Sequence, residues 1–282
     1  MESHGRDAAW KIGDRTLDFA DGPAVMGIVN VTPDSFSDGG KFYTPADAVE
    51  QALRLEDAGA TILDIGGEST RPYSEPVDGD EELRRVLPVL ESLLPRVSAA
   101  VSVDTSKAAV AKAAVQLGVH IINDVTGLEG DPEMISVAAN CQAGVCAMHM
   151  QGTPQTMQDA PAYGDVVADI KEYLAARLTT LTEHGIAPER ICLDPGVGFG
   201  KTHDHNLELV RRCEEFHSLG RPILIGHSRK GFIGKILNDK QAERTSGSVA
   251  ISLALARKGV QVIRVHDVAQ TCRALACQAA IS

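Results

Sequence analysis

The stretch MGIVNVTPDSFSDGG, residues 26–40, decides how the rest of the chain is read. It begins inside a short apolar run, 23–29, of the kind that forms a buried strand. Asn30 stands where that run ends, and turn-forming residues fill most of the next ten positions. A connection this long between a strand and a helix tends to carry function. We therefore predict a strand that brings an amide to a site, then a loop, with Phe36 in its middle, that closes over it.

The same alternation of short apolar runs and amphipathic segments continues along the chain. Further strands are predicted at 61–65, 100–103, 120–122, 144–148, 190–193, 222–225 and 261–265. Helices are predicted at 45–59, 80–94, 106–117, 131–141, 165–184, in a segment ending near 218, at 229–237 and 243–258, and at the C-terminus. Eight β/α units without a linker predict one α/β domain, 1–282, with a parallel sheet. The count favours a closed TIM (β/α)8 barrel, and the pattern alone leaves an open eight-stranded sheet as the alternative.

Residues 10–20 precede the first barrel strand and have the pattern of a small β-hairpin. Two short strand-like segments, 10–12 and 16–19, flank a Gly13-Asp14 turn. We expect this N-terminal hairpin to cover the N-terminal end of the barrel.

The composition narrows the class of protein. Of 282 residues, 44% are hydrophobic, which is enough for a sizeable core, and the formal net charge is −11. So acidic a chain is not expected to have nucleic acid or an anionic membrane as its main partner. The six cysteines form no CxxC pair, which favours free thiols in a reducing compartment. Because no apolar signal region or bilayer-spanning run is present, we expect a cytoplasmic protein.

Polar or charged residues stand at the end of every predicted strand. One such residue is usually a helix cap or a turn former. Eight in succession favour a site, because the carboxyl ends of the strands of a TIM barrel converge on one pocket. The set comprises Asn30, residues 68–71, Asp104, Asn123 with Asp124, Met148 with His149, Asp194, residues 228–230, and Arg264 with His266.

These strand-end residues offer two kinds of chemistry. The carboxylates and amide of Asp104, Asn123 and Asp194 suit a flat heterocycle with an amino-imine edge, since a carboxylate accepts two parallel N–H bonds. The donors and cations, which suit phosphate or carboxylate, are Arg71, Lys230, Arg264 and His266. A phosphate site near the seventh and eighth strands is common in this fold.

A glycine-rich segment, residues 196–202, resembles a nucleotide-binding loop only superficially. The Walker pattern requires glycine where Pro195 stands, and Lys201 replaces the third glycine of a GxGxxG motif. We interpret the segment as a loop of close backbone approach beside Asp194. For His149 we expect packing or hydrogen bonding rather than metal binding.

Eight sequence blocks, in this order, resemble the dihydropteroate synthase family: NVTPDSFSDGG, DIGGESTRP, SVDT, INDV, MHMQGTP, DPGVGFGK, SRKGFIG and RVHDV. They extend from Asn30 to Asp267, so the resemblance covers nearly the whole chain. It implies a TIM barrel, usually a homodimer, that is a target of sulfonamides. It also implies a transferase of folate biosynthesis that condenses (7,8-dihydropterin-6-yl)methyl diphosphate with 4-aminobenzoate to give 7,8-dihydropteroate and diphosphate.

The resemblance also assigns roles to individual residues. The pterin would be held by Asp104, Asn123, Met148, Asp194 and Lys230. The diphosphate would be held by Asn30, Thr70, Arg71, Arg264 and His266, with Mg2+ bound to Asn30 and to phosphate oxygens. The 4-aminobenzoate would lie among Phe36, Thr70, Pro72, Gly198, Phe199, Lys230 and Gly231. The residues implied in catalysis are Asp104, Lys230, Arg264 and His266.

Two other functions stay open at this point. A related pterin-binding barrel transfers a methyl group from methyltetrahydrofolate to a corrinoid, but it would not need the SRKG and RVHD blocks or the two long loops present here. A non-catalytic pterin-binding paralogue would not need the intact set of Asn30, Arg71, Lys230, Arg264 and His266.

Two positions depart from the family pattern. Gly231 stands where a serine often follows the lysine, and His227 precedes the serine-arginine pair. With glycine at 231, we expect 4-aminobenzoate to be held by backbone N–H groups of residues 230–232, where a helix is predicted to begin. The sequence suggests no role for His227.

Overall fold

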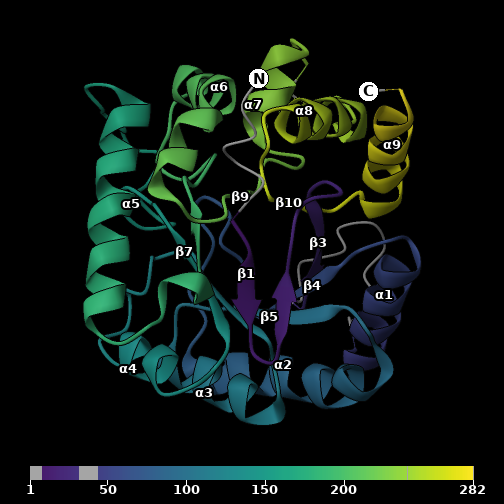
Figure 1. Ribbon diagram of the computed structural model, residues 1–282, viewed down its shortest axis with the longest axis vertical. Coiled ribbons are helices and arrows are strands. Elements are labelled where there is room, and N and C mark those ends of the chain that lie inside the picture. The colour runs from purple at the N-terminus through teal and green to yellow at the C-terminus, as the bar shows by residue number, and fades with distance from the viewer. Residues whose placement is uncertain (1–7, 32–43, 240, 282) are drawn as a thin grey trace.

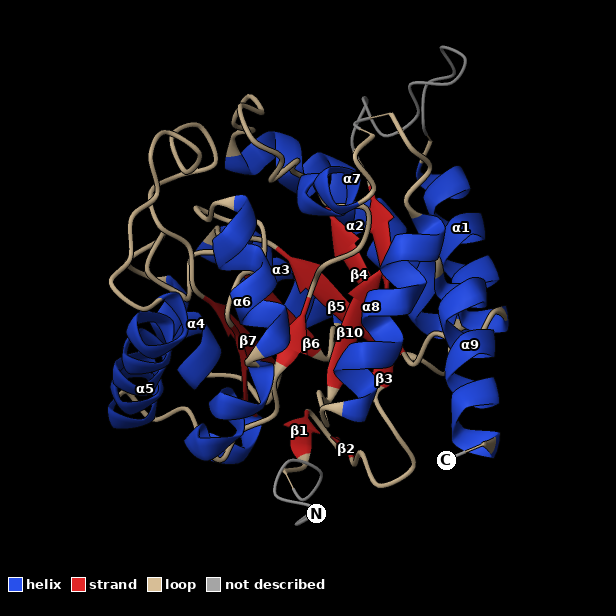
Figure 2. Cartoon of the chain, turned by 90° about the horizontal axis from the view of Figure 1, so that it is seen from above, coloured by secondary structure: helices blue, strands red, loops and turns tan. Residues whose placement is uncertain are grey.

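The computed structural model describes residues 8–31, 44–239 and 241–281. Eight strands form a ring at the centre, with helices around it (Figure 1, Figure 2). All neighbouring strands pair in parallel, in the order β8-β7-β6-β5-β4-β3-β10-β9. A bridge between Leu193 and Ile223 joins the two ends of this order. The predicted TIM barrel is therefore confirmed, and the open sheet is excluded.

The barrel strands coincide with the predicted runs, but five of them, β3 to β6 and β8, extend further at their carboxyl ends. Ladder hydrogen bonds use only the backbone, so a polar side chain does not end a strand. Asn30 pairs in register with Gly66, and Asp104 pairs with Asn123. The strands are β3 (Ala24–Asn30), β4 (Ile62–Gly66), β5 (Ala100–Asp104), β6 (Ile121–Asp124), β7 (Gly144–Met148), β8 (Ile191–Asp194), β9 (Leu224–Ile225) and β10 (Val262–Val265).

The helices also match the prediction, with differences at their ends. They are α1 (Pro45–Asp57), α2 (Gly79–Leu93), α3 (Ala108–Leu117), α4 (Met134–Ala139), α5 (Val166–Glu183), α6 (His203–Arg211), α7 (Gly231–Ile236), α8 (Thr245–Arg257) and α9 (Val268–Ala280). Short 3-10 turns are η1 (Leu94–Arg96), η2 (Pro188–Arg190) and η3 (Cys213–Leu219). Helix α3 begins later than predicted, and the N–H of Ala108 donates to Asp131 from another loop, at 2.9 Å. In the described part of the chain, no helix is long and apolar enough to cross a membrane.

Apolar side chains form two separate clusters, because successive residues of a strand point to opposite faces. The larger cluster lies between the strands and the helices and includes Val29, Ile65 and Val103. The smaller cluster lies inside the barrel and includes Met26 and Ile62.

An N-terminal hairpin of β1 (Trp10–Ile12) and β2 (Arg15–Leu17) belongs to the inner cluster. Trp10 and Ile12 are fully buried, and the indole N–H of Trp10 donates to the carbonyl of Arg190 at 2.9 Å. In Figure 1, β1 lies across the centre of the ring of helices. The hairpin therefore covers the N-terminal end of the barrel, as predicted, and leaves the opposite end to polar side chains.

Truncating Trp10 should destabilise the whole domain. Trp10→Ala removes the largest side chain of the inner cluster and should lower the free energy of unfolding by about 3–5 kcal/mol. Urea unfolding followed by circular dichroism measures this change. The control, Leu117→Ala at a partly exposed position, should alter it by no more than about 0.5 kcal/mol. Equal losses in the two variants would show that the hairpin is not part of the core.

Candidate active site

Polar side chains occupy the barrel interior directly above the inner apolar cluster. Residues two apart in a strand share a face, so the strand that brings Ile62 into the cluster carries Asp64 on the same side. Register then places Ser102 beside Asp64, and Asp104 beside Gly66. By the same alternation, the polar interior positions are Asn30, Asp64, Ser102, Asp104, Asn123, Asp194, Arg264 and His266.

The guanidinium of Arg264 joins two carboxylates at the centre of this layer. Its Nε donates to Asp64 Oδ2 and its Nη2 donates to Asp104 Oδ2, both at 2.6 Å. Asn123 Nδ2 donates to the same Asp64 oxygen at 3.1 Å. Asp64 has no exposed surface, whereas Arg264 keeps 19% of its side chain exposed. One guanidinium thus fixes side chains from β4, β5 and β10 at the carboxyl ends of the strands.

Burial raises the pKa of two carboxyl groups in this layer, Asp104 and Asp194. Burial raises the pKa of Asp104 to about 7, and the Asp64 carboxylate adds to the rise while Arg264 opposes it. Burial also raises the pKa of Asp194, although a hydrogen bond from the N–H of Gly196 opposes the rise. The pKa of Arg264 is raised, because Asp64 and Asp104 outweigh the cost of its burial. Asp104 can therefore exchange a proton near neutral pH.

The glycine loop after β8 makes the close backbone approach predicted for it. Gly196 has φ 69°, and a Cβ there would lie 1.9 Å from the carbonyl oxygen of His149, so no other residue fits. Its N–H donates to Asp194 Oδ1 at 2.7 Å. Buried Lys201 lies 2.9 Å from His149 Nδ1 and donates to the carbonyl of Phe199 at 2.8 Å. The hydrogen-bonding role expected of His149 is therefore the one observed.

Lys230 approaches the same polar layer from the turn before α7, where the charges of Asp194, Arg264 and Asp104 act on it. Its ammonium donates to the carbonyl of Val197 and lies 4.3 Å from the centre of the Phe199 ring. A Cβ at Gly198 would lie 2.6 Å from Lys230 Cδ, so this approach also needs glycine. Burial lowers the pKa of Lys230 to about 7, and Arg264 lowers it further while Asp194 opposes the change.

His266 follows β10 and faces the same centre as a neutral ring. Burial lowers its pKa to about 3, and the charges of Arg264 and Arg71 act in the same direction. Ser228 Oγ lies 3.1 Å from His266 Nδ1 and accepts the His266 N–H at 3.2 Å. At neutral pH His266 is therefore a hydrogen-bonding group rather than a cation.

The loop after β4 brings the remaining predicted residues to the rim. Thr70 is half-buried, while Arg71 and Pro72 are exposed. The loop rests on the connection after β7, since the N–H of Tyr73 donates to the carbonyl of Pro154 at 3.0 Å. Phe36, which was predicted to close over the site, lies outside the described residues.

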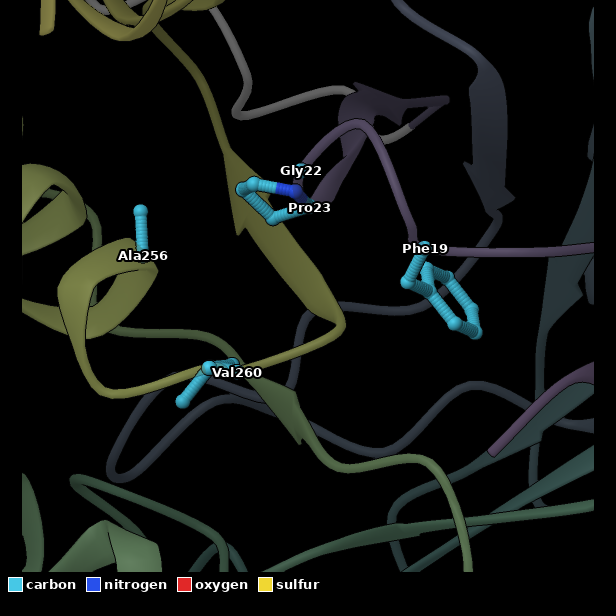
Figure 3. A pocket seen from close by; sticks show the side chains of 6 residues that line it. Phe19, Gly22, Pro23, Ala256 and Val260 are labelled. Carbon is cyan, nitrogen blue, oxygen red and sulfur yellow. The ribbon is translucent and has the colours of Figure 1, made fainter. Parts of the chain in front are cut away.

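Two cavities differ sharply in size and position. A cavity of about 560 Å³ lies among the loops that follow β4 to β7 and is lined by Thr70 and Lys107, among others. The hollow in Figure 3, at the opposite end of the barrel, holds about 10 Å³ between Phe19 and Val260. That hollow has room for at most one water molecule and has no titratable side chain in its lining. Substrate-sized space therefore lies among the loops at the carboxyl ends of the strands, and of the described residues to which the family resemblance assigns a role only Thr70 lines this cavity.

Sequence reasoning missed three residues that organise this site. For Asp64 the sequence did contain a signal, since it is a lone carboxylate within an otherwise apolar strand. A buried charge needs a partner, so its position indicated a contact with a cation. Ser228 was treated only as part of a charged block. Lys201 was noted only for breaking a glycine motif.

Comparison with known proteins identifies the family. The family described as "Pterin binding enzyme" matches residues 26–266. The dihydropteroate synthase of Escherichia coli K12 is 49% identical over 253 residues, which cover 90% of this chain and 89% of the relative. The chain belongs to the dihydropteroate synthase family. The predicted enzyme class, a transferase of folate biosynthesis, is thereby confirmed.

Solved structures of the family share the whole fold. The Yersinia pestis dihydropteroate synthase, in a complex with a sulfonamide drug, superimposes with a TM-score of 0.91 at 44% identity, covering 97% of this chain and 98% of that one. The Burkholderia cenocepacia dihydropteroate synthase, complexed with 7,8-dihydropteroate, gives a TM-score of 0.87 at 43% identity, covering 97% and 96%. The barrel and its hairpin are thus those of the synthase family.

The burial of Asp104 predicts that the stability of the protein depends on pH. Because the pKa of Asp104 is raised, its contribution to folding is fully present below about pH 4, the unfolded pKa, and is lost as the pH rises through 7. Asp104→Asn cannot ionise and leaves Arg264 with Asp64. It should therefore be more stable than the wild type at pH 8, by at least about 1 kcal/mol, and nearly equal to it at pH 4.

Urea unfolding at the two pH values measures this difference. The control Asp21→Asn removes an exposed aspartate and should shift stability similarly at both. If Asp104→Asn is less stable than the wild type at pH 8, the Asp104 carboxylate is a net stabilising group and the description of the charge balance is wrong.

Proposed function

We propose that the side chains around Arg264 carry out the condensation of (7,8-dihydropterin-6-yl)methyl diphosphate with 4-aminobenzoate, giving 7,8-dihydropteroate and diphosphate. The observation that carries this proposal is that the Arg264 guanidinium forms ion pairs with both Asp64 and Asp104 at the carboxyl ends of the strands. It puts hydrogen-bond acceptors for a heterocycle and a cation for a phosphate in one layer of the barrel interior.

The pterin ring fits the acceptor side of the pocket. Asp194 uses Oδ1 to accept the N–H of Gly196, and no described residue hydrogen-bonds its Oδ2, which is free to accept from the amino-imine edge. Asn123 uses Nδ2 toward Asp64 and leaves its amide oxygen for the ring. We assign Met148, buried at the end of β7, to pack on the ring, with Asp104 and Lys230 at its edge.

The diphosphate fits the opposite side, toward β3 and β10. Arg264 and neutral His266 donate hydrogen bonds, and Arg71, whose charge acts on His266, completes the group with Thr70. Asn30 ends β3 half-buried, and no described residue hydrogen-bonds its amide. The described residues contain no cluster of three His, Cys, Asp or Glu side chains that could enclose a metal ion. One amide oxygen plus phosphate oxygens and waters suits Mg2+, which keeps few protein ligands.

The chemistry begins with departure of diphosphate. Bound Mg2+ would supply positive charge to the leaving oxygens. Arg264 and His266 donate to the charge that grows there. The Asp104 carboxylate stabilises the cation-like methylene, and the aryl amine then attacks that carbon. Lys230, with its pKa lowered to about 7, is able to accept the proton that the amine loses. No protein nucleophile is required.

The 4-aminobenzoate is assigned to the slot between the glycine loop and α7. Gly198, Phe199 and Lys230 form one wall through the contact of the ammonium with the ring. Gly231 begins α7, and a Cβ there would meet nothing within 4 Å, so its backbone is open to a carboxylate. Thr70 and Pro72, together with Phe36, would close the slot from the two long loops.

We extend the proposal to a cytoplasmic homodimer that sulfonamides inhibit. Ile236 at the end of α7 and Leu237 directly after it expose about half of their surface, 51% and 45%, and α8 lies beside α7 (Figure 1), so this face suits a second copy. Free cysteines fit a reducing cytoplasm. Sulfonamide binding by the Yersinia pestis relative supports inhibition here.

The direct test of function is product formation. The chain, incubated with the pterin diphosphate, 4-aminobenzoate and Mg2+, should release dihydropteroate detectable by mass spectrometry. A heat-killed sample is the control. If no product exceeds that control, the proposal is refuted and the non-catalytic paralogue is the function that remains. Methyl transfer from methyltetrahydrofolate to a corrinoid would instead indicate the other barrel class.

A second test separates the diphosphate side from the pterin side. Asn30→Ala, or chelation of Mg2+, should lower kcat at least tenfold, because the lost interaction acts on charge that develops as diphosphate departs. The affinity for a pterin without diphosphate, measured by calorimetry, should change by less than about twofold. Similar losses in both measurements would remove Asn30 from the diphosphate side.

A further inference from the structure

The turn that carries Lys230 contains a residue in a conformation that non-glycine residues rarely adopt. Arg229 has φ 58°, in the left-handed region. Such a backbone conformation persists only where several surrounding contacts hold it in place. The turn joins β9 to α7, and its next two residues, Lys230 and Gly231, face the proposed 4-aminobenzoate slot.

Three separate contacts hold Arg229 in this conformation. Its N–H donates to Ser248 Oγ at 3.0 Å, and its carbonyl accepts from Arg244 Nη1 at 2.9 Å. Its guanidinium forms a two-pronged pair with Asp267, in which Nε lies 3.0 Å from Oδ2. Asp267 is 5% exposed, so this pair is half shielded from water although Arg229 itself is 51% exposed. The contacts come from α8, from the residue before α8 and from the residue before α9.

The residues on either side of Arg229 are anchored as well. Ser228 Oγ accepts the N–H of His266, and Lys230 donates to the carbonyl of Val197. His227 is fully buried below the turn, with Nε2 2.8 Å from the carbonyl of Ser248. The unusual histidine thus joins the base of the turn to α8, at the same residue whose hydroxyl accepts the N–H of Arg229.

We propose that Ser248 and Asp267 are positioning residues for the synthase reaction, which hold Arg229 left-handed so that Lys230 and Gly231 face the 4-aminobenzoate slot. This inference rests on the proposed function, because that function assigns Lys230 and Gly231 to the slot. The Arg229 guanidinium is engaged by Asp267 and is not needed for substrate contact.

The proposal makes the apparent affinity depend on the population of the left-handed turn. When the competent conformation is a fraction of the total, the apparent dissociation constant rises by the inverse of that fraction. Glycine populates positive φ about as readily as negative φ, whereas alanine strongly disfavours it. Arg229→Gly and Arg229→Ala both delete the guanidinium and differ only in the Cβ.

The decisive experiment compares the KM for 4-aminobenzoate in these two variants. We expect the KM of Arg229→Ala to be about tenfold higher than that of Arg229→Gly. The KM for the pterin diphosphate and kcat at saturation should differ by less than twofold between them. If the two variants have equal KM values for 4-aminobenzoate, the backbone conformation is not what Arg229 contributes and the proposal is overturned.

A pair of serines in α8 gives a second test that stands if both Arg229 variants misfold. Ser248→Ala leaves the N–H of Arg229 without its acceptor and should raise the KM for 4-aminobenzoate about fivefold. The control Ser252→Ala deletes an equally buried hydroxyl that contacts His227 and the Ser248 carbonyl but not Arg229. It should leave this KM within twofold. Equal effects of the two variants would contradict the proposal.

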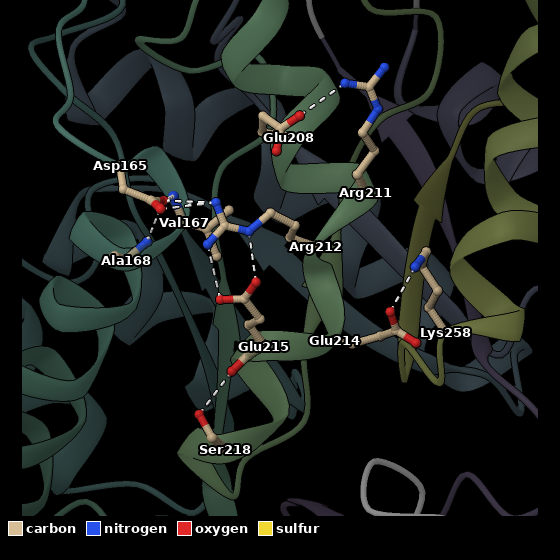
Figure 4. A network of polar contacts seen from close by, with 10 residues as sticks. All are labelled: Asp165, Val167, Ala168, Glu208, Arg211, Arg212, Glu214, Glu215, Ser218 and Lys258. Atoms are coloured by element: carbon tan, nitrogen blue, oxygen red, sulfur yellow. Dashed lines mark hydrogen bonds and ion pairs between the residues drawn. The ribbon is translucent and has the colours of Figure 1, made fainter. Parts of the chain in front are cut away.

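The aspartate–arginine pair has a matched control elsewhere in the molecule. Arg212 Nη1 donates to both oxygens of Asp165, at 3.1 and 3.0 Å, between α5 and η3 (Figure 4). Asp267→Asn should raise the KM for 4-aminobenzoate, whereas the control Asp165→Asn should not. An unchanged KM in Asp267→Asn would contradict the positioning role of Asp267. A wild type that forms no dihydropteroate would instead refute the proposed function, so the two failures are distinguishable.

Discussion

The pair of hydrogen bonds from the Arg264 guanidinium to the carboxylates of Asp64 and Asp104 is the interaction on which this active site depends. A single guanidinium is shared by Asp64 and Asp104, and burial raises the pKa of Asp104 to about 7 although Arg264 opposes the rise. An anionic substrate and its leaving group therefore meet a cation whose position is fixed from two sides. The barrel supplies the rigid frame, since the three residues come from β4, β5 and β10.

The inner cluster explains why such a charged layer is tolerated. The hairpin and the lower strand residues fill the N-terminal half of the barrel with apolar side chains, with Trp10 at its base. Two residues further along the same strands, the same interior face turns polar. The covered end supplies stability and the open end supplies chemistry, as is general for TIM barrels.

The sequence predicted the barrel well, because alternation between apolar runs and amphipathic segments is a local signal. It placed Asp104, Asn123, Asp194 and Arg264 at strand ends, and the structure brings them together in one polar layer of the barrel interior. It could not show that Asp64 is the partner of Arg264, because that contact spans 200 residues. The left-handed Arg229 also depends on a contact with a distant segment, through Asp267. The neutral state of His266 follows mainly from its burial, which only the folded chain provides.

The most direct test of the central claim is the turnover of Arg264→Lys, measured as dihydropteroate formed per enzyme at saturating substrates. Lysine keeps the positive charge but concentrates it on one ammonium group. The two hydrogen bonds need a planar group with separate N–H donors toward Asp64 and Asp104. We expect turnover to fall by roughly two orders of magnitude, with circular dichroism unchanged. A lysine variant that keeps a rate close to the wild type would contradict the account, because charge alone would then suffice.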